Sequence, residues 1–161
     1  MFVLFISSYS SVLSFLLWLH LFAFSQGIPL GARYKYAQSG CTFLLPMATI
    51  LETGNHIAQN GDGTVRKKIA IRFVEQVKAA FNGEAPWRPT AFPNTAEILL
   101  WIDEFPDQAG KNKAPDKQEG TSFGDLSIIE EFRKSCKLFP LSEVFIWSLD
   151  RDLQNYHQMP T

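Results

Sequence analysis

Between residues 44 and 59, the pattern of hydrophobic and polar positions changes from that of a strand to that of a helix. The segment LLPMATILETGNHIAQ opens with two leucines and Pro46, which are typical of the end of a short buried strand. From there the spacing is helical, and one predicted buried stripe comprises Met47, Ile50, Leu51, Ile57 and Ala58. A second, polar stripe on the same helix comprises Glu52, Asn55, His56 and Gln59. Glu52 therefore follows a strand end, where α/β proteins bind ligands, although a solvated helix face explains this residue equally simply.

The first 32 residues contain no Asp, Glu, Lys or Arg, and residues 2–24 are mostly apolar. One interpretation is a buried strand at 2–6, a serine-rich turn and a buried helix at 11–24, followed by a short helix at 33–38. The other is a signal or transmembrane segment, which would place the protein in the membrane or outside the cell rather than in the cytoplasm. A positively charged start is missing, but Ala23-Phe24-Ser25 resembles a cleavage site, so the second interpretation stays open.

The middle of the chain predicts a strand at 42–45, the helix described above, and a second helix at 64–81 after the turn Asn-Gly-Asp-Gly. Val65, Ile69, Phe73, Val77 and Phe81 repeat every four residues along this second helix. Its other face is basic and comprises Arg66, Lys67, Lys68, Arg72 and Lys78. This face is either solvated or a contact for a phosphate backbone.

Residues 86–90 contain two prolines, which favours an edge strand or a loop over a central strand. Asn94 and Glu97 have the spacing of a capping box, which opens an apolar helix that we expect to end near Pro106. Residues 107–120 are polar and contain glycine and proline, so they predict an exposed loop that could form a lip over a site.

The C-terminal third predicts a helix with Ser122 as its N-cap, and Asp125 lies where the acid of a capping box would lie. The segment EVFIW at 143–147 predicts a strand. Either Asp150 or Asp152 could cap a short final helix after it.

Length and composition predict a single domain over residues 1–161. The chain is 46% hydrophobic and 14% aromatic, which is enough for a sizeable core. Because 15 Lys and Arg balance 16 Asp and Glu, the net charge does not decide whether the protein binds nucleic acid.

The alternation of strands and helices predicts a central, mainly parallel sheet. Glu52 and Asp150 each follow a strand, and Asp125 opens the helix expected between them, so these three acids can converge at one sheet edge. Clustered carboxylates repel one another unless a cation binds them, and oxygen ligands favour Mg²⁺ or Mn²⁺. Glu52 and His56, one turn apart, are an alternative pair of zinc ligands.

In order along the chain, LLPMATILETGNHIA, SFGDLSII and VFIWSLDRDL resemble the successive motifs of PIN-domain ribonucleases, the fold of VapC-type toxins. The resemblance implies a three-layer α/β/α fold with a central, mainly parallel sheet. It implies that Glu52, Asp125 and Asp150 are the catalytic acids that hold Mg²⁺ or Mn²⁺. Ser148 would support them by hydrogen bonding, with Asn55 and Asp152 as further supporting residues.

The chain departs from this family at its first strand, which normally ends in Asp. Here residues 2–6 are followed by Ser7, and serine carries no charge. The first acid is therefore missing, either because the site is weakened or because residues 1–32 reflect an altered gene start.

The expected function is metal-dependent hydrolysis of RNA phosphodiester bonds, with RNA contacts from Arg66, Lys67, Lys68, Arg72 and Arg151. The resemblance also implies an antitoxin-type protein partner and a homodimer as candidate partners. Two alternatives are a catalytically inactive PIN-like module that binds RNA or protein, and a membrane-anchored protein if residues 2–24 span the bilayer.

Overall fold

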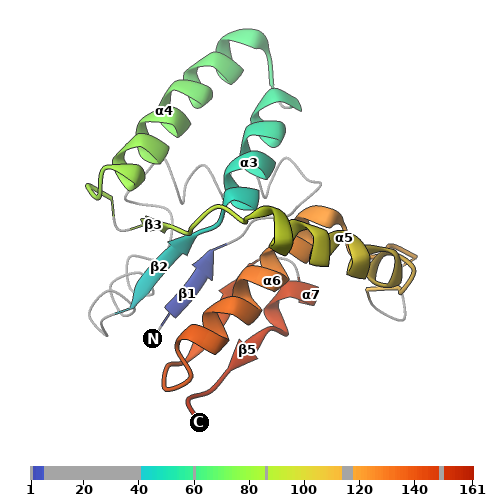
Figure 1. The fold of residues 1–161 in the computed structure, drawn as a ribbon. Coiled ribbons are helices and arrows are strands. Elements are labelled where there is room, and N and C mark those ends of the chain that lie inside the picture. Colours follow the sequence, from blue (N-terminus) through green and yellow to red (C-terminus); the bar gives the residue numbers. More distant parts are fainter. Residues whose placement is uncertain (1, 6–40, 60, 86, 114–117, 149–150) are drawn as a thin grey trace.

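Strands and helices alternate along the chain in the computed structural model, which describes residues 2–5, 41–59, 61–85, 87–113, 118–148 and 151–161. The strands are β1 (Phe2–Phe5), β2 (Thr42–Leu45), β3 (Trp87–Pro89), β4 (Val144–Trp147) and β5 (His157–Gln158). The helices are α3 (Met47–Gln59), α4 (Gly63–Phe81), α5 (Thr95–Ala109), α6 (Phe123–Leu138) and α7 (Arg151–Gln154). The expected α/β class is confirmed (Figure 1).

The strands form one sheet in the order β3-β2-β1-β4-β5. The pairs β1–β2, β1–β4 and β2–β3 are parallel, and β5 pairs antiparallel with β4. In this register Leu4 of β1 lies between Leu44 of β2 and Ile146 of β4. The carboxyl ends of β1, β2 and β4 therefore lie side by side. Figure 1 shows this for the arrows of β1 and β2. The proline-containing segment predicted as an edge strand or loop is the edge strand β3.

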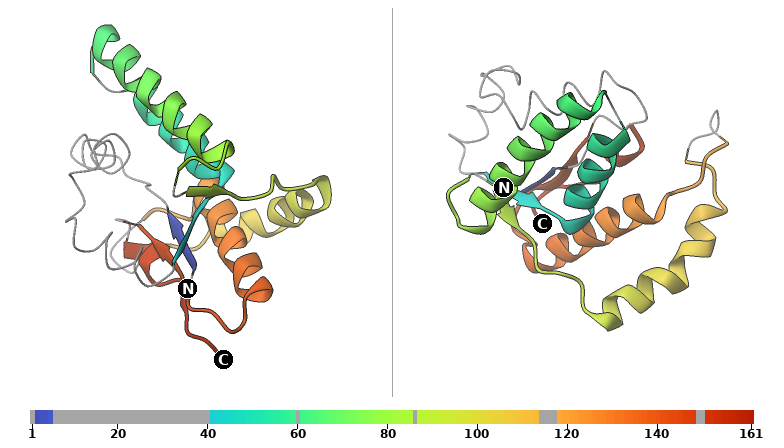
Figure 2. Two further views of the ribbon diagram at one scale, coloured as in Figure 1. Left: turned by 90° about the vertical axis from the view of Figure 1, so that its left-hand side faces the viewer. Right: turned by 90° about the horizontal axis from the view of Figure 1, so that it is seen from above.

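The alternation of side chains along the strands places apolar groups on both faces of the sheet. On one face Phe43 and Leu45 pack with Ala80 of α4 and with Trp87, and the Phe43 and Trp87 rings meet edge to face at 5.3 Å. On the other face Val144 and Ile146 pack against a buried stripe of α6. That stripe comprises Ile128, Ile129 and Phe132. The core is thus divided between the two faces, and α6 closes the second one (Figure 2).

Helix α3 has the predicted bounds, but its buried side differs from the predicted stripe. The buried residues are Thr49, Thr53 and Ile57, whereas Leu51 is 56% exposed and Ala58 is also exposed. Of the predicted stripe, Ile57 is confirmed as buried, and Ile50 is partly buried against the core cluster that contains Phe43 and Leu45. The prediction failed because α3 contacts both α4 and α6, and it presents threonine side chains to the interior. A hydrophobic pattern cannot identify a buried face that is made of threonine.

Helix α4 begins after Asp62, whose carboxylate accepts hydrogen bonds from the backbone of Thr64 and Val65 at 2.8 and 3.0 Å. The predicted apolar repeat is only partly covered, because Val65 and Phe81 are exposed by 44% and 51%. Ala80, which the repeat does not include, is the residue of α4 that is buried. Helix α4 therefore meets the sheet near its C-terminal end, and much of it extends away alongside α3 (Figure 2).

Helix α5 begins with the predicted capping box: Glu97 N–H donates to Asn94 at 3.0 Å, and Asn94 N–H donates to Glu97 at 2.8 Å. It ends at Ala109 rather than near Pro106. Proline lacks the N–H group that would donate one helical hydrogen bond. Its carbonyl still accepts from Gly110 N–H at 3.0 Å, so the helix continues past Pro106 to Ala109. The first residues of the predicted 107–120 loop are therefore helical.

The predictions for the serine-rich turn, the helix at 11–24 and the helix at 33–38 lie outside the described residues. The described helices include none that is long and apolar enough to cross a membrane.

Candidate functional site

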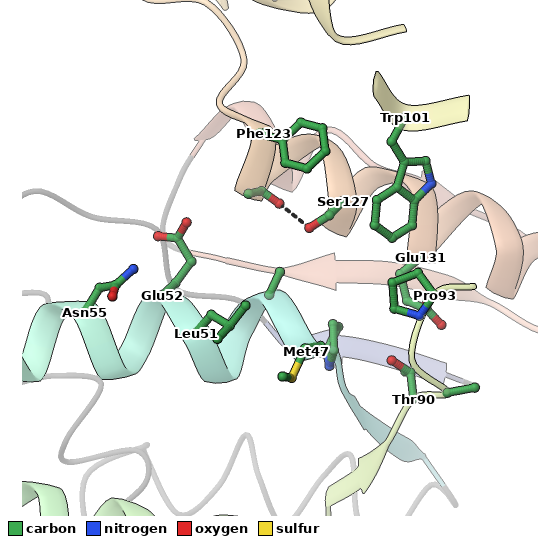
Figure 3. Close-up of a pocket in the computed structure, with 14 residues that line it drawn as sticks. Met47, Leu51, Glu52, Asn55, Thr90, Pro93, Trp101, Phe123, Ser127 and Glu131 are labelled. Carbon is green, nitrogen blue, oxygen red and sulfur yellow. Dashed lines mark hydrogen bonds between the residues drawn. The ribbon is translucent and has the colours of Figure 1, made fainter. Parts of the chain in front are cut away.

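Glu52 lies on the second turn of α3, close to the sheet edge formed by the carboxyl ends of the parallel strands. Helix α3 starts directly after β2, because the Pro46 carbonyl accepts from the N–H groups of Thr49 and Ile50 at 3.1 and 3.4 Å. This junction carries Glu52 to a half-buried position facing α6 (Figure 3). The predicted placement of Glu52 beyond a strand end is confirmed.

Gly124, the second residue of α6, allows Glu52 to approach this closely. A Cβ atom on Gly124 would lie 2.3 Å from Glu52 Oε1 and 3.2 Å from its carboxyl carbon. A side chain at position 124 would therefore require the Glu52 carboxylate to move away from α6. No sequence pattern predicts this contact, because only the packing of α3 against α6 brings Glu52 to Gly124.

Asp125 follows Gly124 and is buried, with 4% of its surface exposed. Ser122 caps the helix as predicted, since its hydroxyl accepts from Asp125 N–H at 3.0 Å. The Asp125 carboxylate, however, pairs with the Lys113 ammonium at 2.6 Å, and both side chains are largely buried. Asp125 therefore forms an ion pair with Lys113, which lies in the loop before α6.

Lys113 belongs to the segment predicted as a lip. An antiparallel bridge between Asn112 and Gly120 closes this loop, and Lys113 N–H donates to the Glu119 carbonyl at 2.8 Å. The loop thus brings a buried cation to Asp125, which the sequence analysis missed. Its polar composition predicted exposure, and no local signal separated Lys113 from the other lysines nearby.

The pKa of Glu52 is raised above its ordinary value of 4.5, chiefly because burial removes water from the carboxylate, and then because Asp125 is negatively charged nearby. His56 and Lys113 oppose this effect and lower the pKa. Four ionisable groups from α3, α6 and the loop therefore act on one another here. Two carboxylates of this group come from different helices, as predicted.

Two carboxylates can hold Mg²⁺ or Mn²⁺ when water and phosphate complete the shell, but here the Lys113 ammonium already pairs with one of them. Within the described ranges, no group of three or more His, Cys, Asp and Glu side chains is arranged to hold a metal. Asp150 and Ser7, the other predicted positions, lie outside those ranges. A metal at Glu52 and Asp125 is therefore a prediction, and so is the alternative zinc pair of Glu52 and His56.

The predicted supporting residues are distributed over two places. Asn55 lines the same cavity as Glu52. Ser148 follows β4 and is buried, but it lines a second cavity beside Gln154, whose side chain donates to the Ser148 carbonyl at 2.7 Å. Asp152 lies within the first turn of α7 and so does not precede that helix as a cap.

The predicted RNA-binding residues of α4 lie outside the cavity that Glu52 lines. Lys67 and Lys68 are exposed, Arg72 is half-buried, and Arg66 donates to the Gly61 carbonyl in the preceding turn. Arg151 is the first residue of α7. The basic face is thus on the helix that packs beside α3, one helix away from the two acids.

A cavity of about 310 Å³ extends from Glu52 between α3, α5 and α6 (Figure 3). Its walls include Leu51 of α3, Trp101 of α5 and Phe123 of α6, and Glu131 of α6 lies toward the end away from Glu52. This explains why Leu51 is not buried. The sequence analysis missed Trp101, Phe123 and Glu131, because each fits an ordinary helical pattern and only the packing of three helices brings them together.

Comparisons of the chain with models of protein families, with curated proteins and with solved structures found no match.

Proposed function

We propose that the protein is a metal-dependent endoribonuclease with a PIN-like, three-layer α/β/α arrangement. The observation that carries this proposal is the approach of Glu52 to Gly124 and Asp125, which collects two carboxylates beside the carboxyl ends of parallel strands. Burial raises the pKa of Glu52, the charge of Asp125 raises it further, and a hard cation would relieve the repulsion between the two acids. Apolar groups on both faces of the sheet agree with a three-layer fold.

Glu52 and Asp125 would hold the cation, which when bound supplies charge neutralisation at the scissile phosphate and a more acidic water. One of the two carboxylates would orient the attacking water and accept its proton as general base. The water oxygen bonds to phosphorus as the ester P–O bond breaks, and the leaving oxygen takes a proton from solvent. Lys113, once separated from Asp125, can donate to a phosphate oxygen.

The RNA backbone would continue from this site toward the exposed lysines of α4. Lys67 and Lys68 carry charges that can pair with phosphates at the cost of bound counterions, and Arg72 and Arg151 are further candidates. Such contacts would weaken as salt concentration rises. A PIN-like toxin would in addition be held inactive by an antitoxin-type protein.

One observation favours the second candidate, a PIN-like module that binds RNA without cleaving it. The Lys113 ammonium already neutralises Asp125 at 2.6 Å, which is the role that a metal ion would take. If this ion pair persists when Mn²⁺ and RNA are present, the protein binds its partner and performs no hydrolysis.

The test is cleavage of single-stranded RNA by the full chain with and without Mn²⁺. We expect weak, Mn²⁺-dependent cleavage that falls by at least about tenfold in Glu52→Gln and in Asp125→Asn, as for loss of a metal-orienting group. Glu75→Gln, an equivalent change at an exposed acid of α4, is the control and should leave the rate unchanged.

Cleavage that neither Glu52→Gln nor Asp125→Asn reduces would refute the assignment of the two acids. Binding of RNA by a folded protein without any cleavage in Mn²⁺ would instead select the non-catalytic module.

A further inference from the structure

We propose that the cavity beside Glu52 binds an unpaired guanine base of the RNA, with the Glu131 carboxylate as the group that selects guanine. This inference rests on the proposed function for the placement of RNA, because a phosphate at Glu52 and Asp125 would put a neighbouring base at the cavity mouth. It adds a binding site and a base preference to that function.

The cavity has a carboxylate toward each of two ends. Glu52 lies toward one end and Glu131 toward the other, with Leu51 of α3 on one wall and the Trp101 and Phe123 rings on the opposite side (Figure 3). Its volume of about 310 Å³ is at the small end of ligand pockets, which suits a single base better than a larger group. Unstacked RNA bases are commonly bound against aromatic side chains in this way.

Contacts between α5 and α6 hold the aromatic side of the cavity in place. Phe123 packs edge to face on Phe105 with ring centroids 5.3 Å apart, so α5 and α6 hold this ring between them. Two ion pairs join the same helices: Lys134 to Glu97 at 2.8 Å and Arg133 to Glu104 at 3.0 Å. The stacking surface is therefore built before any ligand arrives, which lowers the entropic cost of binding.

Glu131 is the charged side chain that α6 contributes to the cavity wall. It is half-buried on α6 and lines an apolar cavity, yet within the described part of the chain no hydrogen bond or ion pair engages its carboxylate. Lys134 of the same helix pairs with Glu97 instead. Burial raises the pKa of Glu131, and the charge of Glu97 raises it further, while Lys134 lowers it. Burying a carboxylate without hydrogen-bond donors costs free energy, and a ligand that supplies the donors would offset this cost.

The ligand that suits the Glu131 carboxylate is defined by its hydrogen-bond donors. An ionised carboxylate only accepts hydrogen bonds, and its two oxygens match two adjacent donors. Guanine presents such a pair, N1–H and the N2 amino group, on its Watson–Crick edge. Adenine and cytosine each place an acceptor beside their amino group, and uracil places acceptors on both sides of N3–H, so all three would direct a lone pair at the carboxylate.

The experiment measures binding of fluorescent single-stranded tetraribonucleotides that differ only in one base, in EDTA so that no hydrolysis occurs. We expect the wild type to bind the guanine-containing oligonucleotide about 10-fold or more tightly than the other three, as for a bidentate contact to a base edge. Glu131→Gln should abolish this preference. Glu130→Gln, the same change at the neighbouring position that does not line the cavity, should preserve it.

A second variant separates stacking from selection. Trp101→Ala should weaken all four oligonucleotides by a similar factor of about 10, because every base has a face that stacks, and the guanine preference should survive. The melting temperature of each variant verifies that it is folded. Equal affinity for all four bases in the wild type, a preference for another base, or retention of the guanine preference in Glu131→Gln would each overturn the proposal.

These results are independent of catalysis. Guanine-selective binding that depends on Glu131, without cleavage in Mn²⁺, would refute the proposed hydrolysis and support the guanine-binding site. Cleavage in Mn²⁺ without any base preference in binding would refute the guanine-binding site and support the proposed hydrolysis.

Discussion

The Glu52 carboxylate lies against Gly124 of α6, in space that a side chain at position 124 would occupy. A methyl group on Gly124 would come within 2.3 Å of Glu52 Oε1. The same contact places Glu52 near Asp125, the next residue along α6. One glycine therefore determines how closely two acids from separate parts of the chain approach each other.

Gly124→Ala should displace the Glu52 carboxylate, because the added methyl group meets the movable end of that side chain. The free energy of unfolding should change by less than about 1 kcal/mol, since alanine favours the helix and offsets part of the steric cost. RNA cleavage in Mn²⁺ should fall by at least about tenfold, as measured by initial rates.

Gly54→Ala is the matched control, since Gly54 lies in the interior of α3 and a Cβ there would meet nothing within 4 Å. We expect it to increase stability by about 0.5–1 kcal/mol, the helix-propensity gain of alanine over glycine, and to leave cleavage unchanged. Full activity in Gly124→Ala would contradict the importance of the Glu52–Gly124 contact.

Lys113→Met should destabilise the fold by about 3 kcal/mol in urea unfolding, because it leaves the buried Asp125 carboxylate without its cation. Adding Asp125→Asn to this variant should recover much of the loss, since the uncompensated charge is then removed. Lys111→Met, at an exposed lysine of the same loop, should have little effect.

The same variants test the cation site by a readout other than activity. Mn²⁺ should raise the melting temperature of Lys113→Met more than that of the wild type, because the ion then has no ammonium to displace. The double variant should show no such rise. An equal response to Mn²⁺ in all three proteins would argue against a cation at Asp125.

The raised pKa of Glu52 implies that the stability of the fold depends on pH. Between its unfolded value near 4.5 and its higher folded value, the folded state binds more protons than the unfolded state. The stabilisation from protonated Glu52 is therefore fully present below pH 4.5 and is lost as pH rises through the folded pKa.

Glu52→Gln should accordingly have a higher melting temperature than the wild type at pH 7, and the two should converge toward pH 4. Thermal unfolding at a series of pH values, without divalent cations, measures this difference. A lower melting temperature of Glu52→Gln at pH 7 would mean that the ionised carboxylate makes a favourable contact, and would contradict the role of desolvation.

Local signals in the sequence determined most of the regular structure. The bounds of β2 and α3, the capping box of α5 and the N-cap of α6 follow from neighbouring residues, and each was predicted correctly. The position of Glu52 beyond a strand end and of Asp125 at the start of a helix follows in the same way. These features depend on interactions over a few residues, which a sequence displays directly.

Only the tertiary structure decided which of these residues meet. The buried face of α3 is made of threonine, the lip delivers Lys113 to Asp125, and Glu131 is left facing an aromatic cavity. Each of these results comes from the packing of α3, α5 and α6 and from a loop that spans a long sequence separation. Burial and charge pairing are properties of the assembled helices. The sequence therefore predicted Glu52 and Asp125 as site residues, but it did not predict Lys113, the role of Gly124 or the cavity around them.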